Sequence, residues 1–411
     1  PIPYSLFPIP YSLFPIPYSL FPIPYSLFPV PCSLFPIMTQ YFATVAKGLE
    51  FVAAQELETL GAHDVRPDFA GVHFSGSRQL LYRVNLWGRT LFRVLVPIAE
   101  FPCPNGERLY QEIQNINWNN YLSPLNTFAV NCTGKNDVLN HTHFTALQVK
   151  NAIIDQQRAE FGERSDIDIN NPDLWINFHI HDEQGILSLD SSGSSLHRRG
   201  YRPAVGLAPL KESLAAALLQ MAEWHPGLPF LDPLCGSGTL PIEASLKGLN
   251  IAPGLFRETF GFMKWKDFDS KLWSDLKQDA LDGQLTSLTA PIVGSDRDED
   301  MIDQASENAQ RCGVAKQIRL HTMELSQVEP PADHGIIICN PPYGERLGNT
   351  EDLAPLYKQL GDVFKQRFKG WTAYVLTGNK ALGKQVGLRT SRRIAVYNGA
   401  LPCTLLKYDL Y

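Results

Sequence analysis

The sequence lacks a Cys-x-x-Cys pair, a long uncharged apolar run and an excess of basic residues. The seven cysteines are dispersed, which excludes a disulfide framework and gives no zinc-site spacing. No stretch has the length and apolarity of a membrane-spanning helix, and no basic region followed by an apolar one opens the chain, so we expect a cytoplasmic protein without a membrane partner. A net charge of -6 provides no global attraction to nucleic acid, and any RNA contact must come from local basic patches.

Residues 1–37 consist of PIPYSLF repeated four times, then PVPCSLF and PI. Two prolines in every seven residues exclude a heptad coiled coil, because proline removes a helical donor and clashes with the preceding turn. A repeated heptanucleotide read through all three frames would generate this peptide. We therefore expect either a disordered Pro-rich segment or upstream sequence read in frame ahead of Met38. The alternative is a genuine Pro-rich binding tail, and mass spectrometry of the native N-terminus distinguishes the two.

The 411 residues, 44% of them hydrophobic and 19% charged, fit a globular protein of two or three domains. Residues 38–90 alternate strand and helix patterns, with strands expected over 41–48 and 71–76 and helices over 49–61 and 77–89. Residues 91–192 repeat this organisation as a second α+β module. Its expected elements are a strand over 90–98, a strand over 127–134, a helix over 143–162 and a hairpin over 174–193 with one apolar face.

A polar joint, SSGSSLHRRGYRP, leads into the longest alternation of strands and helices, which we assign to residues 193–411. The expected strands cover 229–234, 291–296, 336–342 and 372–378, and a closing hairpin over 392–411 turns at Asn398-Gly399. Such alternation predicts an α/β domain with a mostly parallel sheet covered by helices on both faces.

The stretch LDPLCGSGTLPIEA ends an apolar strand at Asp232, places glycines at 236 and 238 and begins a helix at Thr239. Such a loop lets a ligand approach the backbone, and the free N–H groups of the helix start attract a carboxylate or phosphate. By itself the pattern is weak evidence, and the alternative is a tight strand-to-helix turn without a ligand. No Lys follows Gly238, which excludes a Walker loop, and Pro241 replaces the third glycine of a dinucleotide fingerprint. An S-adenosylmethionine site fits better, with the loop at the methionine end.

Asp296 ends the next apolar strand, in IVGSDRDEDMI, and precedes an amphipathic helix. If this strand lies next to the strand that ends at the glycine loop, the Asp296 carboxylate would accept hydrogen bonds from both ribose hydroxyls of the cofactor. The alternative is a helix N-cap carboxylate.

The tetrapeptide Asn340, Pro341, Pro342 and Tyr343 follows the buried strand IIIC. Prolines fix φ and supply no donors, so the nearby carbonyls are rigid acceptors at the carboxyl end of a strand, where ligands bind. The Asn340 side-chain oxygen and the Pro341 carbonyl could accept the two N–H bonds of an exocyclic amine and aim its nitrogen at a sulfonium methyl. Tyr343 would stack on the extruded base. The alternative is a strand terminator with a structural tyrosine.

Together, DPLCGSGTLPIEA, GSDRDED and NPPYGERLG resemble class I, amino-group-methylating RNA methyltransferases. The nearest resemblance is to the bacterial 23S ribosomal RNA guanine-N2 methyltransferase family, in which residues 196–219 look like the junction between a THUMP RNA-binding domain and the catalytic domain. The resemblance extends over residues 38–411. It implies a Rossmann-like domain with a seven-stranded sheet and a C-terminal β-hairpin, preceded by a ferredoxin-like module and a THUMP-like domain.

The resemblance implies S-adenosylmethionine as cofactor and 23S rRNA, or a large-subunit assembly intermediate, as partner. It places Asp232, Cys235, Gly236, Gly238 and Thr239 near the methionine moiety, and Asp296 at the ribose. Glu324 stands where related enzymes carry an Asp beside the adenine amine. Residues Asn340 to Tyr343 match the catalytic tetrapeptide.

For RNA contact the densest basic cluster is Arg198, Arg199 and Arg202, beside Tyr201. Arg346 follows the tetrapeptide. Phosphate contacts from such clusters depend on salt. A second cluster consists of Arg389, Arg392 and Arg393. It is equally consistent with phosphate contact and with solvated surface charge. Histidines 141, 143, 179 and 181 have no third ligand nearby, and we expect no metal site.

Three other functions remain open at this point. The NPPY tetrapeptide suits any exocyclic amine, so tRNA guanine-N2 or DNA adenine-N6 methylation would use the same residues. DNA is disfavoured because nothing N-terminal resembles a base-reading helix. A non-catalytic RNA-binding assembly factor could keep the fold without turnover.

Overall fold

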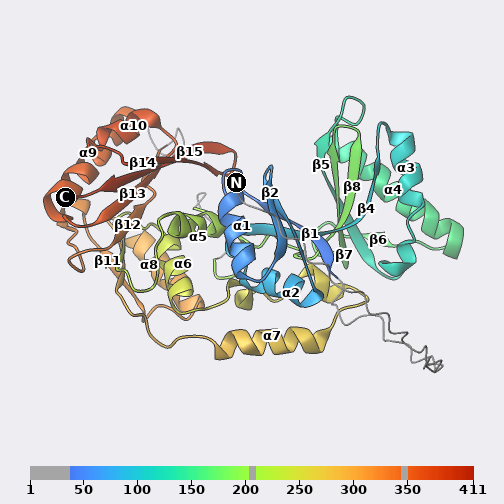
Figure 1. Cartoon of the computed structure of the whole chain (residues 1–411), viewed down its shortest axis with the longest axis horizontal. Helices are drawn as coiled ribbons and strands as arrows, with labels where there is room; N and C mark the ends of the chain where they lie inside the picture. Colours follow the sequence, from blue (N-terminus) through green and yellow to red (C-terminus); the bar gives the residue numbers. More distant parts are fainter. Residues whose placement is uncertain (1–37, 203–209, 344–349) are drawn as a thin grey trace, which may run out of the picture. The chain divides into compact units, whose positions relative to one another are not determined.

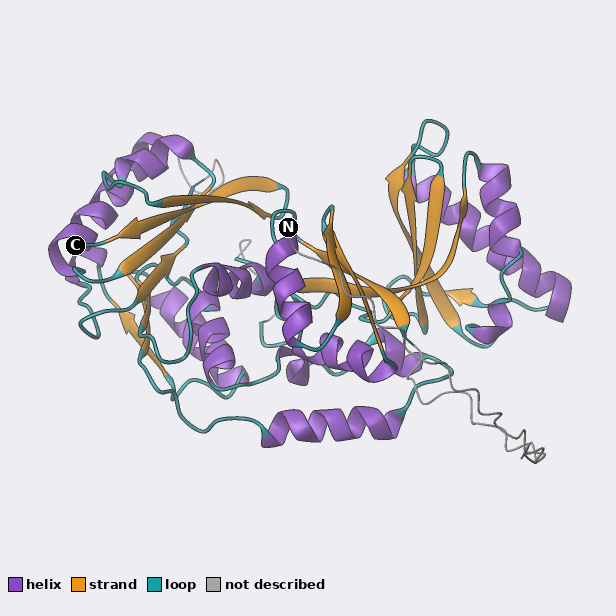
Figure 2. Ribbon diagram, viewed as in Figure 1, coloured by secondary structure: helices purple, strands orange, loops and turns teal. Residues whose placement is uncertain are grey.

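The computed structural model describes residues 38–202, 210–343 and 350–411, and these contain two β-sheets of eight and seven strands (Figure 1). Figure 2 shows the same chain by element type, with helices beside both sheets. The predicted fold class, an α/β methyltransferase-like domain preceded by α+β modules, is confirmed.

The N-terminal module provides one half of the eight-stranded sheet, in the order β2-β3-β1-β4. Its strands are antiparallel, and Ser77 caps the second helix by accepting from Leu80 N at 3.3 Å. The elements are β1 (Thr39–Val45), α1 (Glu50–Thr59), β2 (His63–Asp68), β3 (Gly71–Gly76), α2 (Arg78–Trp87) and β4 (Leu91–Pro102). The two strands and two helices predicted before residue 90 are all present.

The second module completes this sheet in the order β4-β8-β7-β5-β6. Its elements are α3 (Gly106–Gln114), a 3₁₀ turn (Trp118–Asn120), β5 (Thr127–Lys135), α4 (Thr142–Phe161), β6 (Asp166–Ile167), β7 (Leu174–His181) and β8 (Gln184–Asp190). Strand β4 belongs to both modules, because its first part pairs with β1, its second part pairs with β8, and Leu95 lies in both registers. The predicted apolar face of β7 is confirmed, since its alternating apolar residues are buried.

The C-terminal sheet has the order β11-β10-β9-β12-β13-β15-β14. Its strands are β9 (Phe230–Asp232), β10 (Ile292–Asp296), β11 (Ile318–Thr322), β12 (Ile336–Cys339), β13 (Thr372–Thr377), β14 (Arg392–Asn398) and β15 (Leu401–Asp409). Adjacent strands from β11 to β13 are parallel, whereas β15 is antiparallel to both of its neighbours. The closing hairpin is confirmed, and its turn lies at Gly399-Ala400 between the paired residues Asn398 and Leu401.

Helices flank this sheet: α5 (Glu212–Met221), α6 (Thr239–Gly248), α8 (Glu299–Arg311), α9 (Thr350–Arg367) and α10 (Lys380–Gln385). Helix α5 packs on α6 and α9 packs on α10, and the two pairs lie on opposite faces of the sheet (Figure 1). Short 3₁₀ turns cover Pro253–Phe256, Gly261–Lys264 and Leu325–Gln327.

The segment between α6 and β10 has no counterpart among the predicted elements. It contains α7 (Ser270–Asp282), and its aromatic residues share a hydrophobic core with the N-terminal module. The rings of Tyr82 and Phe262 stack with centroids 4.3 Å apart, and Trp273 meets both rings edge-on. Residues distant in sequence therefore join the N-terminal module to the segment between α6 and β10 through one apolar cluster.

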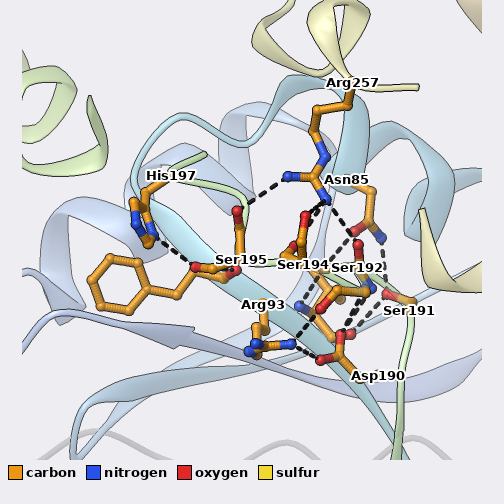
Figure 3. A network of polar contacts seen from close by, with 12 residues as sticks. Asn85, Arg93, Asp190, Ser191, Ser192, Ser194, Ser195, His197 and Arg257 are labelled. Carbon is orange, nitrogen blue, oxygen red and sulfur yellow. Dashed lines mark hydrogen bonds and ion pairs between the residues drawn. The ribbon is translucent and has the colours of Figure 1, made fainter. Parts of the chain in front are cut away.

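The polar joint predicted before the C-terminal domain is packed into this structure (Figure 3). Ser191 and Ser192 are fully buried, and Asn85 Nδ2 donates to Ser191 Oγ at 2.9 Å. The Arg257 guanidinium donates to the carbonyls of Ser192 at 3.0 Å, Ser194 at 2.8 Å, Ser195 at 3.1 Å and Arg198 at 3.0 Å. One side chain from the C-terminal half thus satisfies the backbone of a segment that the sequence presents as hydrophilic.

Candidate active site

Four neighbouring strands, in the order β11-β10-β9-β12, end at the same edge of the C-terminal sheet. Because they run parallel, the residues at or after their carboxyl ends converge there. Asp232 ends β9, Asp296 ends β10, Glu324 follows β11 and Asn340 follows β12. Three separate sequence motifs therefore form one site.

The glycine loop has a backbone that only glycine adopts comfortably. Gly236 and Gly238 have φ angles of +51° and +81°. A Cβ added to Gly238 would also lie 2.9 Å from the Cβ of Ala305, so the loop or α8 would have to shift. Gly238 is the N-cap of α6, and no side chain caps this helix start. Its free N–H groups suit an anionic group such as a carboxylate.

Asp296 joins the ends of β9 and β10. Its Oδ2 accepts from Gly236 N at 2.9 Å, and its Oδ1 accepts from Asp298 N at 3.1 Å. An ionised carboxylate has about four acceptor positions, so two remain for a ribose diol. The alternative reading of this residue as a helix N-cap is wrong, because Asp298 caps α8 by accepting from Asp300 N.

Asp232 is 2% exposed, and its Oδ1 accepts from Leu234 N at 3.2 Å. Burial raises the pKa of this carboxyl well above its ordinary value, and the nearby Asp296 charge adds to the effect. Burial raises the pKa of Cys235 and of Cys339 in the same way, so neither thiol is an activated nucleophile. A positively charged ligand beside Asp232 and Asp296 would oppose this shift and favour the ionised form of Asp232.

The remaining predicted cofactor residues lie at the same edge. Cys235 is 7% exposed and its N–H donates to Ser295 O at 2.9 Å, while Thr239 begins α6. Glu324 is exposed and precedes the 3₁₀ turn after β11. The structure brings them together with Asp232 and Asp296, and their contacts with a cofactor stay predictions.

Asn340 carries a buried acceptor without a partner. Its Oδ1 accepts no hydrogen bond from the residues that the structure describes. Buried polar atoms in proteins are nearly always hydrogen-bonded, so an exception at the carboxyl end of a sheet strand is a candidate for a contact with a ligand donor. Pro341 beside it is buried and Pro342 is half-buried.

Tyr343 is held from three sides. Its hydroxyl accepts from Asn398 Nδ2 at 3.0 Å, and Cys403 Sγ lies 3.6 Å from the same oxygen. Its ring packs on Gly378, where an added Cβ would lie 2.8 Å from a ring carbon. Burial raises the pKa of its phenol, so the hydroxyl stays neutral. The role of this ring as a stacking surface for a base stays a prediction.

The contacts that fix these loops had no signal in the sequence. Asn308 on α8 donates from Nδ2 to Ser237 O in the glycine loop at 3.1 Å, across 71 residues. Asn398 and Cys403 come from the closing hairpin, more than fifty residues after Tyr343. Only the folded sheet brings such partners together, and single polar residues on a hairpin are too common to single out.

Two predicted RNA-binding residues are buried, and their assignment is wrong. Arg199 and Tyr201 are each 1% exposed. Arg199 Nε lies 3.4 Å from Glu243 Oε1, and its guanidinium donates to the carbonyls of Leu196 and Gly88. Tyr201 also donates to Glu243 Oε1, at 3.3 Å. A buried carboxylate on α6 needs a counter-ion, and Arg199 supplies it instead of contacting a phosphate.

The other members of the predicted RNA-binding set differ in exposure. The Arg202 side chain is 11% exposed, and its Nε lies 3.1 Å from Glu212 Oε1, so it too stabilises the joint. Arg198 is exposed. Arg346 lies outside the described residues. Among the described members, RNA contact therefore stays a prediction for Arg198, as it does for the exposed cluster Arg389, Arg392 and Arg393.

No group of three or more His, Cys, Asp or Glu residues within 38–202, 210–343 and 350–411 could hold a metal ion. Among the helices of the same ranges, none has the length and apolarity needed to cross a membrane.

Three family descriptions match consecutive parts of the chain. Residues 40–95 match the RlmL ferredoxin-like domain, residues 104–190 match the THUMP domain and residues 199–407 match the RMKL-like methyltransferase domain. The resemblance inferred from the motifs is confirmed. The precise domain boundaries stay a prediction, because β4 is shared between two modules.

Curated relatives cover most of the chain. A Synechocystis sp. protein named as a candidate RNA methyltransferase is 58% identical over 371 residues, which are 90% of this chain and 97% of the relative. The ribosomal RNA large subunit methyltransferases K/L of Methylococcus capsulatus and Syntrophotalea carbinolica are each 42% identical over 90% of this chain. The chain spans about half the length of these two relatives, 51% and 53%.

Solved structures agree with this result. A candidate methyltransferase in complex with SAH has a TM-score of 0.82 and 31% identity, covering 91% of this chain and 98% of its own. A methylase-like protein of Clostridium difficile 630 has a TM-score of 0.83 and 31% identity, covering 91% and 98%. TrmN from Thermus thermophilus has a TM-score of 0.66 at 21% identity, covering 91% and 100%, and shares the fold.

The residues at the sheet edge fit S-adenosylmethionine, the cofactor of these methyltransferases. Asp232 and the neighbouring Asp296 would suit the positive charge of this cofactor, and the uncapped start of α6 would suit its carboxylate. Asp296 keeps acceptor capacity for a ribose. The fold, the loops at this edge and the matched relatives agree, and the chain belongs to the RMKL-like methyltransferase family.

Proposed function

We propose that this protein methylates the exocyclic N2 amine of a guanine in 23S ribosomal RNA, presented as naked rRNA or in a large-subunit assembly intermediate. The observation that carries the proposal is the buried, unpartnered Oδ1 of Asn340. An exocyclic amine has two N–H donors, and the Asn340 Oδ1 can accept a hydrogen bond from one of them. The K/L relatives are named for large-subunit rRNA, which supports ribosomal RNA as the substrate class.

Asn340 and the two prolines would position the base. The Asn340 Oδ1 and the Pro341 carbonyl would accept one N–H bond each and hold the amine plane in a fixed orientation. Proline rings keep this backbone rigid, so little conformational entropy is lost when the base enters. Burial of the acceptor strengthens these hydrogen bonds, because water does not compete for them.

Asp232, Asp296 and the glycine loop would hold the cofactor. S-adenosylmethionine supplies a methyl group on a sulfonium, which is already a good leaving group. The protein therefore contributes alignment and electrostatic stabilisation and requires no activated nucleophile. This agrees with the raised pKa values of Cys235 and Cys339, which keep both thiols protonated.

The N-terminal modules would bind structured RNA. The matched THUMP domain, the ferredoxin-like module and the exposed Arg198 supply surfaces for this role, with contacts to phosphates that weaken as salt rises. A partner of this kind places the protein in the cytoplasm, where the large subunit is assembled.

Methyl transfer from labelled S-adenosylmethionine to unmodified 23S rRNA, large-subunit intermediates, bulk tRNA and DNA tests the proposal. Digestion to nucleosides and mass identification should give N2-methylguanosine in 23S rRNA or its particle. N2-methylguanosine in tRNA alone would show that tRNA is the substrate. Methyladenine in DNA would show that the protein is a DNA adenine methyltransferase and would overturn the proposal. No product from any substrate would favour a non-catalytic RNA-binding assembly factor.

A further inference from the structure

Two exposed loops of the N-terminal module place an aromatic ring and a cation beside the C-terminal hairpin. Phe69, in the turn between β2 and β3, is 75% exposed. Lys47, in the loop between β1 and α1, is also exposed. Its Nζ lies 5.4 Å from the centre of the Phe69 ring and 5.1 Å from the centre of the Tyr397 ring on β14. We refer to Lys47, Phe69 and Tyr397 as the aromatic platform.

The loops that carry the platform are held in place by the same acid. Glu50 Oε2 accepts from Gly48 N at 2.8 Å, and Glu50 Oε1 accepts from Ala70 N at 3.2 Å. Gly48 has a φ of +87°, and a Cβ there would lie 2.9 Å from Ala395 O on β14. The loop therefore approaches the hairpin backbone closely, at a position that favours glycine. The backbone contacts of Glu50 and Gly48 therefore fix both loops that carry the platform.

The platform and the candidate active site share strand β14. Tyr397 precedes Asn398, whose side chain donates to the Tyr343 hydroxyl at 3.0 Å. Consecutive residues of a strand point to opposite faces, so Tyr397 and Asn398 lie on the two sides of β14. Strand β14 is the edge of its sheet. An RNA strand that delivers a base to Asn340 would cross this edge and reach the platform with a neighbouring nucleotide.

Groups of both charge signs surround the platform. Two carboxylates lie nearby, and each is engaged by protein donors: Glu50 accepts from two backbone N–H groups, and Asp68 accepts from Phe69 N and contacts His73 at 3.1 Å. The hydrogen bond from Phe69 N lowers the pKa of Asp68, so this carboxyl keeps its negative charge and the attraction for a phosphate comes from Lys47. Arg392 and Arg393 are exposed on the same edge strand. An exposed ring beside a cation is the arrangement that binds unpaired bases by stacking, with the backbone phosphate near the positive charge.

We infer that the aromatic platform stacks an unpaired nucleotide that flanks the target base in the RNA substrate. The inference rests on the proposed function, because an RNA substrate must pass this edge. Phe69 supplies the stacking face, Lys47 holds the two rings and attracts phosphate, and Tyr397 connects the platform to the strand that positions Tyr343. The alternative is that Lys47 only joins the N-terminal module to the hairpin, in which case the Phe69 ring contributes nothing to RNA binding.

The first test separates ring stacking from apolar contact. Phe69→Leu keeps the apolar character and removes the ring, whereas Phe69→Trp keeps a ring. Phe51→Leu is the matched control, since Phe51 is 77% exposed in the same module. We expect Phe69→Leu to raise the KM for rRNA by roughly tenfold, the scale of one base stack, with kcat within about twofold. Phe69→Trp should restore KM and Phe51→Leu should leave it unchanged. Equal KM values for Phe69→Leu and the unaltered protein would overturn the inference.

The second test does not require turnover. Stacking of a base quenches tryptophan fluorescence, so a short single-stranded oligoadenylate RNA is titrated into the Phe69→Trp and Phe51→Trp proteins. Quenching confined to Phe69→Trp supports the platform. If no rRNA is methylated in the same preparation, only the proposed function fails and the platform stands. Equal or absent quenching in both variants would overturn the platform even if 23S rRNA is methylated. A partner of another class, such as a protein, would leave the oligoadenylate titration flat.

Discussion

Arg199 and Asn340 are two polar side chains placed inside the same domain, and they differ in whether their partners are present. The Arg199 guanidinium lies against Glu243 and donates to backbone carbonyls around it. The Asn340 Oδ1 has no partner among the described residues. A buried polar group with its partners stabilises the fold, whereas a buried acceptor without a partner at a strand end is a candidate for a ligand contact.

Two side chains around Arg199 also carry atoms without hydrogen-bond partners among the described residues. Arg89 Nη1 and Glu243 Oε2 are both buried and unpaired. They belong to groups of opposite charge, and the Glu243 charge opposes the lowering of the Arg89 pKa that burial causes. The joint therefore compensates its charges internally. Asn340 has no such compensation, and a neutral amide with a free acceptor is better matched to an N–H donor than to an ion.

Replacing Arg199 by Met tests the structural side of the comparison and should have the largest effect. The change leaves Glu243 buried without its counter-ion, which costs about 3–5 kcal/mol of unfolding free energy. Urea denaturation measures the loss. Arg198→Met, at the exposed neighbouring position, is the control and should change stability by less than about 0.5 kcal/mol. A stability of Arg199→Met equal to that of the control would show that the buried pair is dispensable.

Replacing Asn340 by Ala tests whether the buried acceptor without a partner binds the substrate. We expect turnover to fall by about 10²–10³-fold, or about 2.7–4 kcal/mol of transition-state stabilisation, with cofactor affinity and stability nearly unchanged. Steady-state methylation and cofactor titration measure the two quantities. Asn340→Asp keeps an acceptor oxygen and indicates whether the acceptor alone is sufficient. Undiminished turnover in the Ala variant would refute the assigned role.

Replacing Asp232 by Asn should separate stability from cofactor binding. The folded-state pKa of Asp232 is raised by burial, so the ionised carboxylate costs stability once the pH exceeds the unfolded pKa of about 4. At pH 7 we expect Asp232→Asn to unfold at higher urea, by on the order of 1 kcal/mol, while its cofactor affinity falls. Below about pH 4 the stability difference should vanish, since the wild-type carboxyl is protonated in both states. A larger difference at low pH would contradict the assigned sign.

The smallest effect is expected for Asn398, whose side chain positions Tyr343 of the NPPY tetrapeptide and does not itself contact the substrate in our proposal. Asn398→Ala removes the hydrogen bond to the Tyr343 hydroxyl, worth about 0.5–1.5 kcal/mol. Turnover should fall a few-fold and cofactor affinity should stay unchanged. Tyr343→Phe removes the same bond from the other side, so the double variant should lose less than the sum of the two single changes. Additive losses would show that the two residues act independently.

The sequence predicted the parts of the site that lie in contiguous motifs. The strands that end at Asp232, at Asp296 and directly before Asn340 were predicted, because an apolar run followed by Gly, Asp or Pro marks the carboxyl end of a buried strand, although two of the expected ranges ran two or three residues too far. Sequence patterns missed β11, whose residues are partly exposed at the sheet edge, and α7, whose core lies in another module. They also misassigned Arg199 and Tyr201, because a basic and aromatic cluster has the same composition whether it faces RNA or a buried carboxylate.

The order of the three motifs and the apolar period of the strands were therefore determined by the sequence, since both depend on neighbouring residues and on helix and strand periodicity. The tertiary structure decided which buried polar groups found partners. Arg199 meets Glu243 across 44 residues, Asn308 meets Ser237 across 71, and Asn398 meets Tyr343 across 55. Such contacts depend on how the sheets and helices pack, and this packing left the Asn340 Oδ1 without a partner among the described residues, which is why we propose that a substrate amine binds there.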